Sequence, residues 1–305
     1  MDFNRLLLFL SVVLSSLLAL RCTRSTDAPA PLQETPLTYS GSPTCQSCHQ
    51  KEYADWLTSD HFRAMQHAAD STVLGDFNNA TFTADGVTSR FFKRDGKFII
   101  QTQGEDGRNH EYEVLYTFGY YPLQQYLIEF PGGRLQATRV SWDSRENKWF
   151  NQYAGDKIHH RDWLHWTGNA QNWNTMCASC HSTDLQKNYQ FSTDRYTTTW
   201  NEINVACETC HGAGSKHVEL MNSNYQEGVR PPNFGLYYGK NTDPQLQLNT
   251  CAPCHARKSD IAQKFMQTSE LMDDLIPQII SHEYYYADGQ IRDEDYEYAS
   301  FAQSK

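Results

Sequence analysis

The sequence predicts an α+β fold that is mainly helical, with an antiparallel β subdomain inserted after the first of four similar pentapeptides. Residues 50–69 contain neither Gly nor Pro, and the composition favours helix again from about Asp162. Between these regions, residues 71–155 contain short β-type runs separated by turn residues. Together these patterns predict a signal peptide (1–21), a flexible tether (22–44), a first pentapeptide segment (45–70), a β-rich subdomain (71–160) and a helical segment (161–305).

The N-terminus has the pattern of an exported protein. Residues 6–20 form an apolar stretch that is short for a membrane span and typical of a secretory signal. Cys22 follows at once, which favours a lipoprotein anchored to a membrane through an acylated Cys22, although Arg21 is unusual before such a cysteine. Simple cleavage and a retained anchor remain alternatives. We expect a periplasmic location, or an outer-membrane or cell-surface lipoprotein, with residues 23–44 as a tether rich in Thr, Ser, Pro and Ala.

Four copies of Cys-x-x-Cys-His occur, at residues 45–49, 177–181, 207–211 and 251–255. This pentapeptide attaches c-type haem, because its two thiols form thioethers and its histidine binds the iron. The sequence therefore predicts four covalent haem c groups. The predicted attachment residues are Cys45, Cys48, Cys177, Cys180, Cys207, Cys210, Cys251 and Cys254, and the predicted proximal ligands are His49, His181, His211 and His255. Zinc bound by four thiolates at each of two sites, or disulfides, are weaker alternatives, since neither needs a histidine after each pair.

The composition agrees with a core that is completed by large flat cofactors. The apolar fraction is 39% and the mean hydropathy is −0.68, which is lean for a self-sufficient core. The aromatic residues, 7 Trp, 18 Tyr and 15 Phe, suit packing against macrocycles. The net charge of −10 argues against a nucleic-acid partner and is compatible with a redox partner that has a basic face.

The insert between the first two pentapeptides is predicted to contain four to six strands. Residues 88–93 and 97–101 flank Arg94-Asp95-Gly96, a hairpin signal. Further strands are predicted at residues 113–116, 127–130 and 135–142, the last after the turn at 131–133.

Eight histidines remain as candidates for the second axial position on each iron. His217 and His61 lie too close in sequence to their own proximal histidines to reach around the same haem, so we expect each to serve another haem. His165 and His282 are further candidates, and His67 is a rival to His61. The other spare histidines are expected at the surface (His110, His159, His160), and five methionines are alternative ligands that more often fill a core (Met65, Met176, Met221, Met266, Met272).

Several segments resemble the multihaem cytochrome family built around the cytochrome c-554 domain, which is found in longer bacterial proteins with tetratricopeptide repeats. They are WLTSDH (56–61), PLQQYL (122–127), LHWTG (164–168), QNWN (171–174), CETCHGAGSKH (207–217) and ADGQI (287–291). The resemblance implies that His61, His165 and His217 are distal ligands. The chain departs from the family at Ala213, at His159-His160 and at Tyr286, which leaves the fourth distal ligand open. The end of the chain resembles a mid-chain piece of the family, as expected for a fragment.

The expected function is electron transfer between redox partners in a respiratory chain, such as other cytochromes, a quinol dehydrogenase or a terminal reductase. An enzyme of nitrite or hydroxylamine chemistry is the alternative, with one five-coordinate haem beside Tyr285, Tyr286, Arg257 and Lys258. A haem module of a longer repeat-containing protein is a third possibility. The sequence favours a carrier over a catalyst.

Overall fold

The computed structural model describes residues 36–223, 232–239, 243–261, 270–278, 280–292 and 296–303. The chain divides into two compact units, Met1–Pro36 and Leu37–Lys305, and the elements below belong to the second. The predicted signal peptide, Cys22 and most of the predicted tether lie outside the described residues. Within the described ranges, no helix has the length and apolar character needed to span a bilayer.

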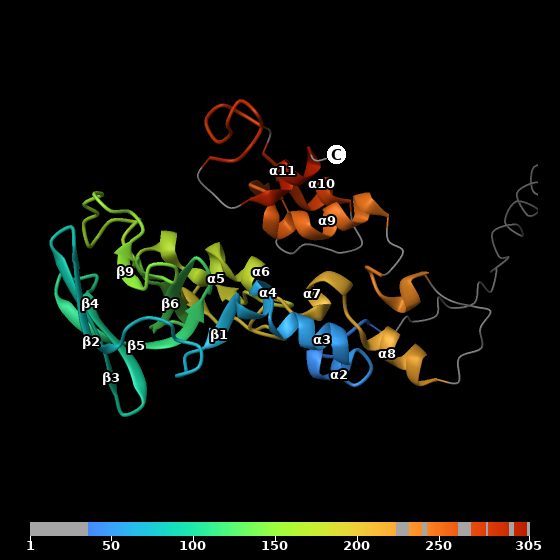
Figure 1. Cartoon of the computed structure of the whole chain (residues 1–305), viewed down its shortest axis with the longest axis horizontal. Coiled ribbons are helices and arrows are strands. Elements are labelled where there is room, and N and C mark those ends of the chain that lie inside the picture. Colours follow the sequence, from blue (N-terminus) through green and yellow to red (C-terminus); the bar gives the residue numbers. More distant parts are fainter. Residues whose placement is uncertain are drawn as a thin grey trace, which may run out of the picture. The chain divides into compact units, whose positions relative to one another are not determined.

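Nine strands form one antiparallel sheet (Figure 1). Its order is β2-β3-β4-β5-β6-β8-β9, with β1 paired to β5 and β7 paired to β6. The strands are β1 (Met65–His67), β2 (Asn78–Ala84), β3 (Val87–Arg94), β4 (Lys97–Gln103), β5 (Asn109–Phe118), β6 (Leu123–Phe130), β7 (Arg134–Ala137), β8 (Val140–Asp143) and β9 (Lys148–Asn151). The insert therefore contains eight strands, β2 to β9, where the sequence predicted four to six.

Two tight turns set the register of the first three strands. The predicted hairpin is confirmed, because β3 and β4 pair with Arg94 opposite Lys97. Asp95 and Gly96 both have positive φ, 52° and 75°, as a two-residue hairpin turn of the primed type requires. Asp85 and Gly86 form the same type of turn between β2 and β3, with φ of 52° and 85°. This second Asp-Gly turn is visible in the sequence but was not used to predict a strand.

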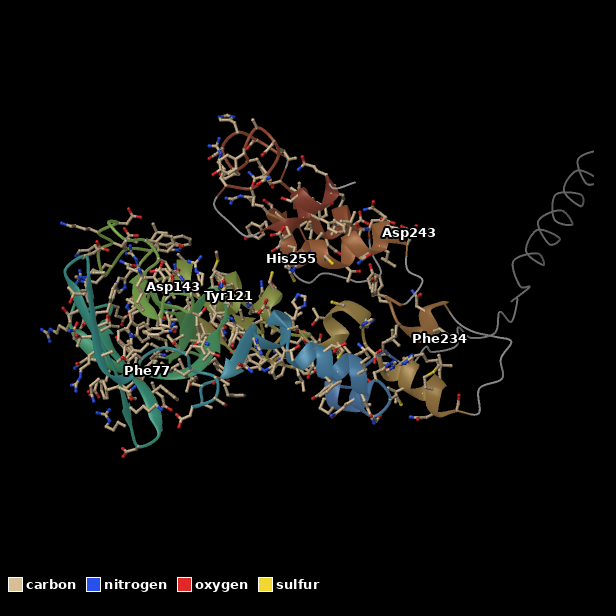
Figure 2. The ribbon with its side chains drawn as sticks, viewed as in Figure 1. Phe77, Tyr121, Asp143, Phe234, Asp243 and His255 are labelled. Carbon is tan, nitrogen blue, oxygen red and sulfur yellow. The ribbon has the colours of Figure 1, made fainter. Side chains whose placement is uncertain are left out.

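The sheet is nearly closed around an aromatic core. Phe91 on β3 stacks on Trp149 of β9 with ring centroids 3.6 Å apart, and Phe77 packs edge-on against both. The two edge strands are tied together where Asn151 Nδ2 donates to Asp85 Oδ2 at 2.6 Å. Phe91 lies on the strand next to the edge strand β2, and Trp149 lies on the edge strand β9, so burying their rings against each other brings the two sides of the sheet together. Phe77 lies within the sheet region in Figure 2.

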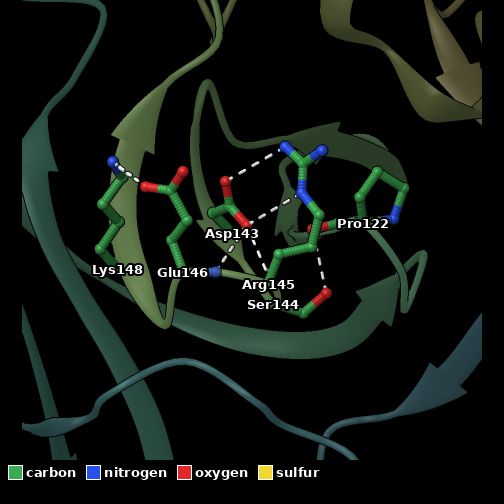
Figure 3. A network of polar contacts seen from close by, with 6 residues as sticks. All are labelled: Pro122, Asp143, Ser144, Arg145, Glu146 and Lys148. Atoms are coloured by element: carbon green, nitrogen blue, oxygen red, sulfur yellow. Dashed lines mark hydrogen bonds and ion pairs between the residues drawn. The ribbon is translucent and has the colours of Figure 1, made fainter.

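The turn between β8 and β9 is held by Asp143 (Figure 3). One carboxylate oxygen, Oδ1, accepts the backbone N–H groups of Arg145 at 2.9 Å and Glu146 at 3.1 Å. Ser144 Oγ donates to the carbonyl of Pro122 at 2.9 Å, which fastens this turn to β6. These bonds satisfy backbone donors that the turn would otherwise leave free.

The prediction of a mainly helical fold is wrong. The described helices are short and the sheet is the largest element. The helices are α2 (Ser42–Gln46), α3 (Gln50–Leu57), α4 (Asp60–Arg63), α5 (Trp173–Met176), α6 (Ala178–His181), α7 (Cys207–His211), α8 (Ser215–Asn222), α9 (Pro244–His255), α10 (Leu271–Asp274) and α11 (Glu297–Ala302), with 3-10 turns η1 (Asn169–Gln171) and η2 (Pro232–Gly235). Two small sheets, β10 (Tyr189–Gln190) with β11 (Arg195–Tyr196) and β12 (Lys258–Asp260) with β13 (Leu275–Pro277), interrupt residues 161–305. A single turn of helix has marginal stability on its own, so the helix propensity of the neighbouring residues is not enough to lengthen these helices.

Residues 50–69 show why composition overestimated the helix. α3 ends at Leu57, and Ser59 starts a new helix by accepting the N–H of Phe62 on its hydroxyl at 3.3 Å. Ser is a helix-capping residue because its side chain competes for backbone donors. Met65 then joins the sheet opposite Phe118 and is fully buried. Tertiary pairing therefore overrides the helical composition of the last five residues. The predicted segment boundaries at residues 70 and 160 stay a prediction.

Candidate functional site

Each Cys-x-x-Cys-His copy lies on or beside a helical turn. The first joins the end of α2 to the start of α3, and the second lies on α6 with Cys177 at its N-cap. The third makes up all of α7, and the fourth ends α9, where His255 is labelled in Figure 2. A two-residue spacer on a helical turn places both thiols on one face, since positions i and i+3 are neighbours. The local geometry therefore suits two thioether bonds to one flat group.

The third copy contacts the first. Cys45 and Cys207 lie close enough for each thiol to change the pKa of the other, which raises the pKa of Cys45 and lowers that of Cys207 to about 6. Ser42 Oγ also donates to Cys207 Sγ at 3.4 Å. These sulfurs are free thiols here and represent the thioether sulfurs of a haem-loaded chain. The predicted attachment points of the first and third copies are therefore adjacent, although 162 positions separate Cys45 from Cys207 along the sequence.

The fourth copy contacts the second and lies near the third. Cys180 and Cys254 share a side-chain hydrogen bond, and Cys180 Sγ lies 3.7 Å from the carbonyl oxygen of Pro253. Cys210 lies near enough to Cys251 and Cys254 to interact with both electrostatically. Burial, with Cys251 as the next cause, raises the pKa of Cys210 to about 11. The spatial order of the four copies is therefore first, third, fourth, second.

Two pairs of histidine rings face each other at the spacing that one metal atom requires. His49 and His217 have ring centroids 6.1 Å apart, and His61 and His255 have the same separation. An imidazole nitrogen lies about 2 Å from a bound metal and its ring centre roughly 1 Å beyond, so two axial rings on one iron have centroids about 6 Å apart. Both pairs therefore fit the axial positions of a haem, and each joins a proximal histidine to a spare one.

On two histidines, His217 and His211, a backbone carbonyl fixes which ring nitrogen is free to bind a metal. His217 Nδ1 lies 3.1 Å from the carbonyl oxygen of Phe234, and His211 Nδ1 lies 2.8 Å from that of Tyr238. A carbonyl oxygen only accepts, so each Nδ1 carries the proton and each Nε2 keeps its lone pair for a metal. Partial desolvation, with His255 as the next cause, lowers the pKa of His61, which favours the neutral, ligating form.

The other two proximal histidines face aromatic rings. His181 packs edge-on against Phe118 with centroids 4.5 Å apart, and burial lowers its pKa to about 4. The ring of His211 lies 5.7 Å from that of Tyr238. Within the described ranges, neither ring packs directly on another histidine ring, although His255 and His61 lie close enough to His181 to contribute to the lowering of its pKa.

The remaining predicted ligands lie elsewhere. His165 is buried, with Nδ1 2.8 Å from Thr167 Oγ1, and burial followed by His160 lowers its pKa to about 4. His282 is exposed, and His67 packs on Tyr116. Met65 is fully buried in the core, whereas Met176, Met221 and Met272 are exposed, and Met266 lies outside the described residues.

The four residues predicted beside a five-coordinate haem are placed as follows. Arg257 lies over the ring of Tyr284 at 3.8 Å, and its Nε donates to Gln278. Tyr285 is buried, Tyr286 is exposed and Lys258 pairs with Asp260. These contacts are packing and surface interactions.

Sequence reasoning missed two carboxylates that hold the first and third copies together. Glu208, inside the third copy, is 2% exposed and accepts the backbone N–H groups of Ser40, Gly41 and Gly214, each at 2.7 Å. Glu202 accepts the N–H of Ser42 at 3.0 Å and its hydroxyl at 2.9 Å. A charged residue between two attachment cysteines, close to a glycine-rich stretch, was the available signal.

The chain matches the family model described as cytochrome c554 and c-prime over residues 44–84 and 140–212. It is similar to the outer cell wall cytochrome OcwA, with 16% identity and a TM-score of 0.54 over 85% of this chain and 49% of that one. It also matches an undecahaem cytochrome from the S-layer of Carboxydothermus ferrireducens, with 16% identity and a TM-score of 0.36 over 89% of this chain and 43% of that one. The chain thus spans about half the length of these structures or less. At this identity, the likeness to OcwA shows the fold alone. No curated protein matches the chain.

Proposed function

We propose, from the premise that this chain is a multihaem cytochrome c of the cytochrome c554 family, that it carries four haem c groups and passes electrons between redox partners. Haem c, once bound, supplies a reversible one-electron centre. The observation that carries the proposal is the proximity of the copies: Ser42 of the first contacts Cys207, Cys210 lies near the fourth copy, and Cys180 contacts Pro253. These contacts make the attachment sites continuous, so the chain holds them as one string with the first and second copies at its ends.

The chain's own residues determine the axial positions in this proposal. His217 would hold the iron of the first copy opposite His49, and His61 that of the fourth copy opposite His255. The carbonyl of Phe234 orients His217 by accepting from its Nδ1. Two imidazole ligands favour a low reduction potential compared with a histidine and methionine pair.

The mass of the mature protein tests the number of haem groups. We expect the mass to exceed that of the processed polypeptide by about 2.5 kDa, since each covalent haem adds about 0.6 kDa. Intact-protein mass spectrometry after export in a host with the haem-attachment machinery measures this. An increase of three haem masses or fewer would contradict the proposed count, and a colourless product would contradict the function.

Replacing a proposed distal histidine should change the spin state of one iron. His217→Ala and His61→Ala are each expected to convert one low-spin ferric haem into a high-spin one, because each removes the imidazole that faces a proximal histidine at 6.1 Å. Electron paramagnetic resonance of the oxidised protein measures the high-spin fraction. His67→Ala is the matched control, since His67 lies in the same region but packs on Tyr116. A spectrum unchanged by His217→Ala would remove this ligand from the proposal.

A catalytic function is the second candidate, and one observation favours it. His181 and His211 face Phe118 and Tyr238 where the other proximal histidines face imidazoles. An iron without a sixth protein ligand is open to a small molecule such as nitrite or hydroxylamine. A high-spin ferric signal in the unaltered protein that changes when nitrite is added would support catalysis. Four low-spin signals would mean that every iron has six ligands, and would leave electron transfer as the only one of the two candidate functions.

An exported, surface-exposed location is part of the proposal. The two similar structures are described as cytochromes of an outer cell wall and of an S-layer, and the N-terminal pattern agrees with export. The redox partners would be other cytochromes, a quinol dehydrogenase or a terminal reductase, and the acidic chain fits a partner with a basic face. Anchoring through Cys22 is tested by mass spectrometry of the mature N-terminus, which would show an acylated Cys22.

A further inference from the structure

A cavity of about 350 Å³ lies beside the nearly closed sheet. Its walls are the turn between β2 and β3, the start of β8, and the segments 157–160 and 165–166. None of its lining residues belongs to a Cys-x-x-Cys-His copy. Its volume is in the range of sites for small organic molecules.

The walls of this cavity carry two positive side chains and one carboxylate. Arg139 and Lys157 line it, and within the described ranges neither forms an ion pair. Arg139 Nη2 donates to the carbonyls of Tyr153 and Asp156, while its Nε is buried without a partner. Asp85 is the one carboxylate of the lining.

The carboxylate of Asp85 is already used within the fold. Its Oδ2 accepts from Asn151 Nδ2 at 2.6 Å and its Oδ1 from the N–H of Gly155 at 3.2 Å. Both oxygens are therefore bound to neutral donors of the sheet edge. The guanidinium of Arg139 therefore keeps a positive charge that no carboxylate of the described residues pairs, beside a cavity that an acceptor from outside the chain can enter.

Two histidines add hydrogen-bond donors to the same walls. The rings of His159 and His160 are 3.9 Å apart, and both line the cavity. The N–H of Arg161 donates to His159 Nδ1 at 3.2 Å, so Nδ1 is the acceptor and Nε2 carries the proton. The lining also includes the apolar side chains of Val87, Val140, Ile158 and Trp166. The cavity thus combines donors for an acid group with a surface for an apolar body.

We propose that this cavity binds a small organic carboxylate, whose acid group is held by Arg139 and Lys157 and whose apolar body packs against Trp166. Arg–carboxylate hydrogen bonds are among the strongest in proteins, because both partners are charged. The site is independent of the haem-attachment residues. His165 is part of its lining, which gives this buried histidine a place outside the four attachment copies.

Isothermal titration of the haem-loaded full chain tests the site with benzoate as the probe and benzamide as its neutral counterpart. We expect benzoate to bind about tenfold more tightly than benzamide, because a charged hydrogen bond contributes about 1.4 kcal/mol or more, which is tenfold. Arg139→Gln should weaken benzoate binding by about tenfold and Lys157→Gln by several-fold. Lys148→Gln is the matched control, since Lys148 pairs with Glu146 and does not line the cavity.

A second variant protects the test against misfolding. Lys157 is exposed, so Lys157→Glu should leave the sheet intact, as circular dichroism would show, and abolish benzoate binding. Equal affinity for benzamide and benzoate, or unchanged binding by Lys157→Glu, would overturn the proposal. So would binding of inorganic phosphate without benzoate. A shift of the Soret band on adding benzoate would show that benzoate binds at an iron, which would also overturn the proposal.

Discussion

Removing the third attachment site is expected to disconnect the first site from the second and fourth. In the proposed function, the Cys207→Ala/Cys210→Ala variant should carry three haem groups and lose fast electron passage away from the first copy. The reason is the spatial order of the copies, in which the third lies between the first and the fourth through Cys45–Cys207 and Cys210–Cys254. Electron transfer between fixed centres falls steeply with distance, so a missing central site costs orders of magnitude in rate.

The measurement uses a photosensitiser on Lys51→Cys. Lys51 lies on α3, next to the first copy, and its side chain is 81% exposed, so a label there does not disturb the core. In the otherwise unaltered protein, electrons injected by a laser flash should leave the first copy in a fast phase. In the Cys207→Ala/Cys210→Ala variant, this fast phase should be absent. The Cys177→Ala/Cys180→Ala variant is the matched control, because it removes a site at the end of the string.

The fast phase should be lost when the third site is removed and kept when the second site is removed. A fast phase that survives loss of the third site, or disappears with loss of the second, would reject the order first, third, fourth, second. The haem content of both variants must be three, and the β-sheet signal in circular dichroism must be retained, for the comparison to count.

The second large effect is expected at Glu208. Glu208→Ala removes the acceptor of three backbone N–H groups, those of Ser40, Gly41 and Gly214. Because Glu208 is buried and these donors are left without a partner, we expect the free energy of unfolding to fall by about 3–5 kcal/mol. Glu208→Gln should cost less, since its amide oxygen still accepts, although the NH₂ group then faces donors.

Denaturant unfolding of the haem-loaded protein measures this change. Glu219→Gln is the matched control, because Glu219 is exposed on α8 and, among the described residues, pairs at the surface with Lys216. That variant should change the free energy of unfolding by about 0.5 kcal/mol or less. Equal stability of Glu208→Ala and Glu219→Gln would show that the carboxylate does not hold the two copies together.

Features that depend on neighbouring residues were predictable. The four copies were evident because thioether attachment needs two thiols and a histidine within five positions. The hairpin of β3 and β4 followed from Asp95 and Gly96, whose positive φ suits few other residues. The second Asp-Gly turn obeys the same rule and could have been predicted.

The balance of helix and strand was not predictable by the same means. The composition of residues 50–69 favours helix, yet Met65 is fully buried as a strand residue opposite Phe118. Burial against a partner 53 positions away outweighs a propensity of a few tenths of a kcal/mol per residue. The eight-strand insert closes because Phe91 and Trp149, from distant strands, stack on each other.

The sequence by itself predicts the chemistry of attachment, namely which eight thiols and which four histidines would hold haem c, since each set lies within five consecutive residues. Only the tertiary structure decided which copies are neighbours, which spare histidine faces which predicted proximal one, and that His165 lines a cavity. The physical reason is that spacing along the chain limits contacts within a turn or hairpin. Contacts such as His61 with His255 depend on the path of the chain between them, which packing of the whole domain sets.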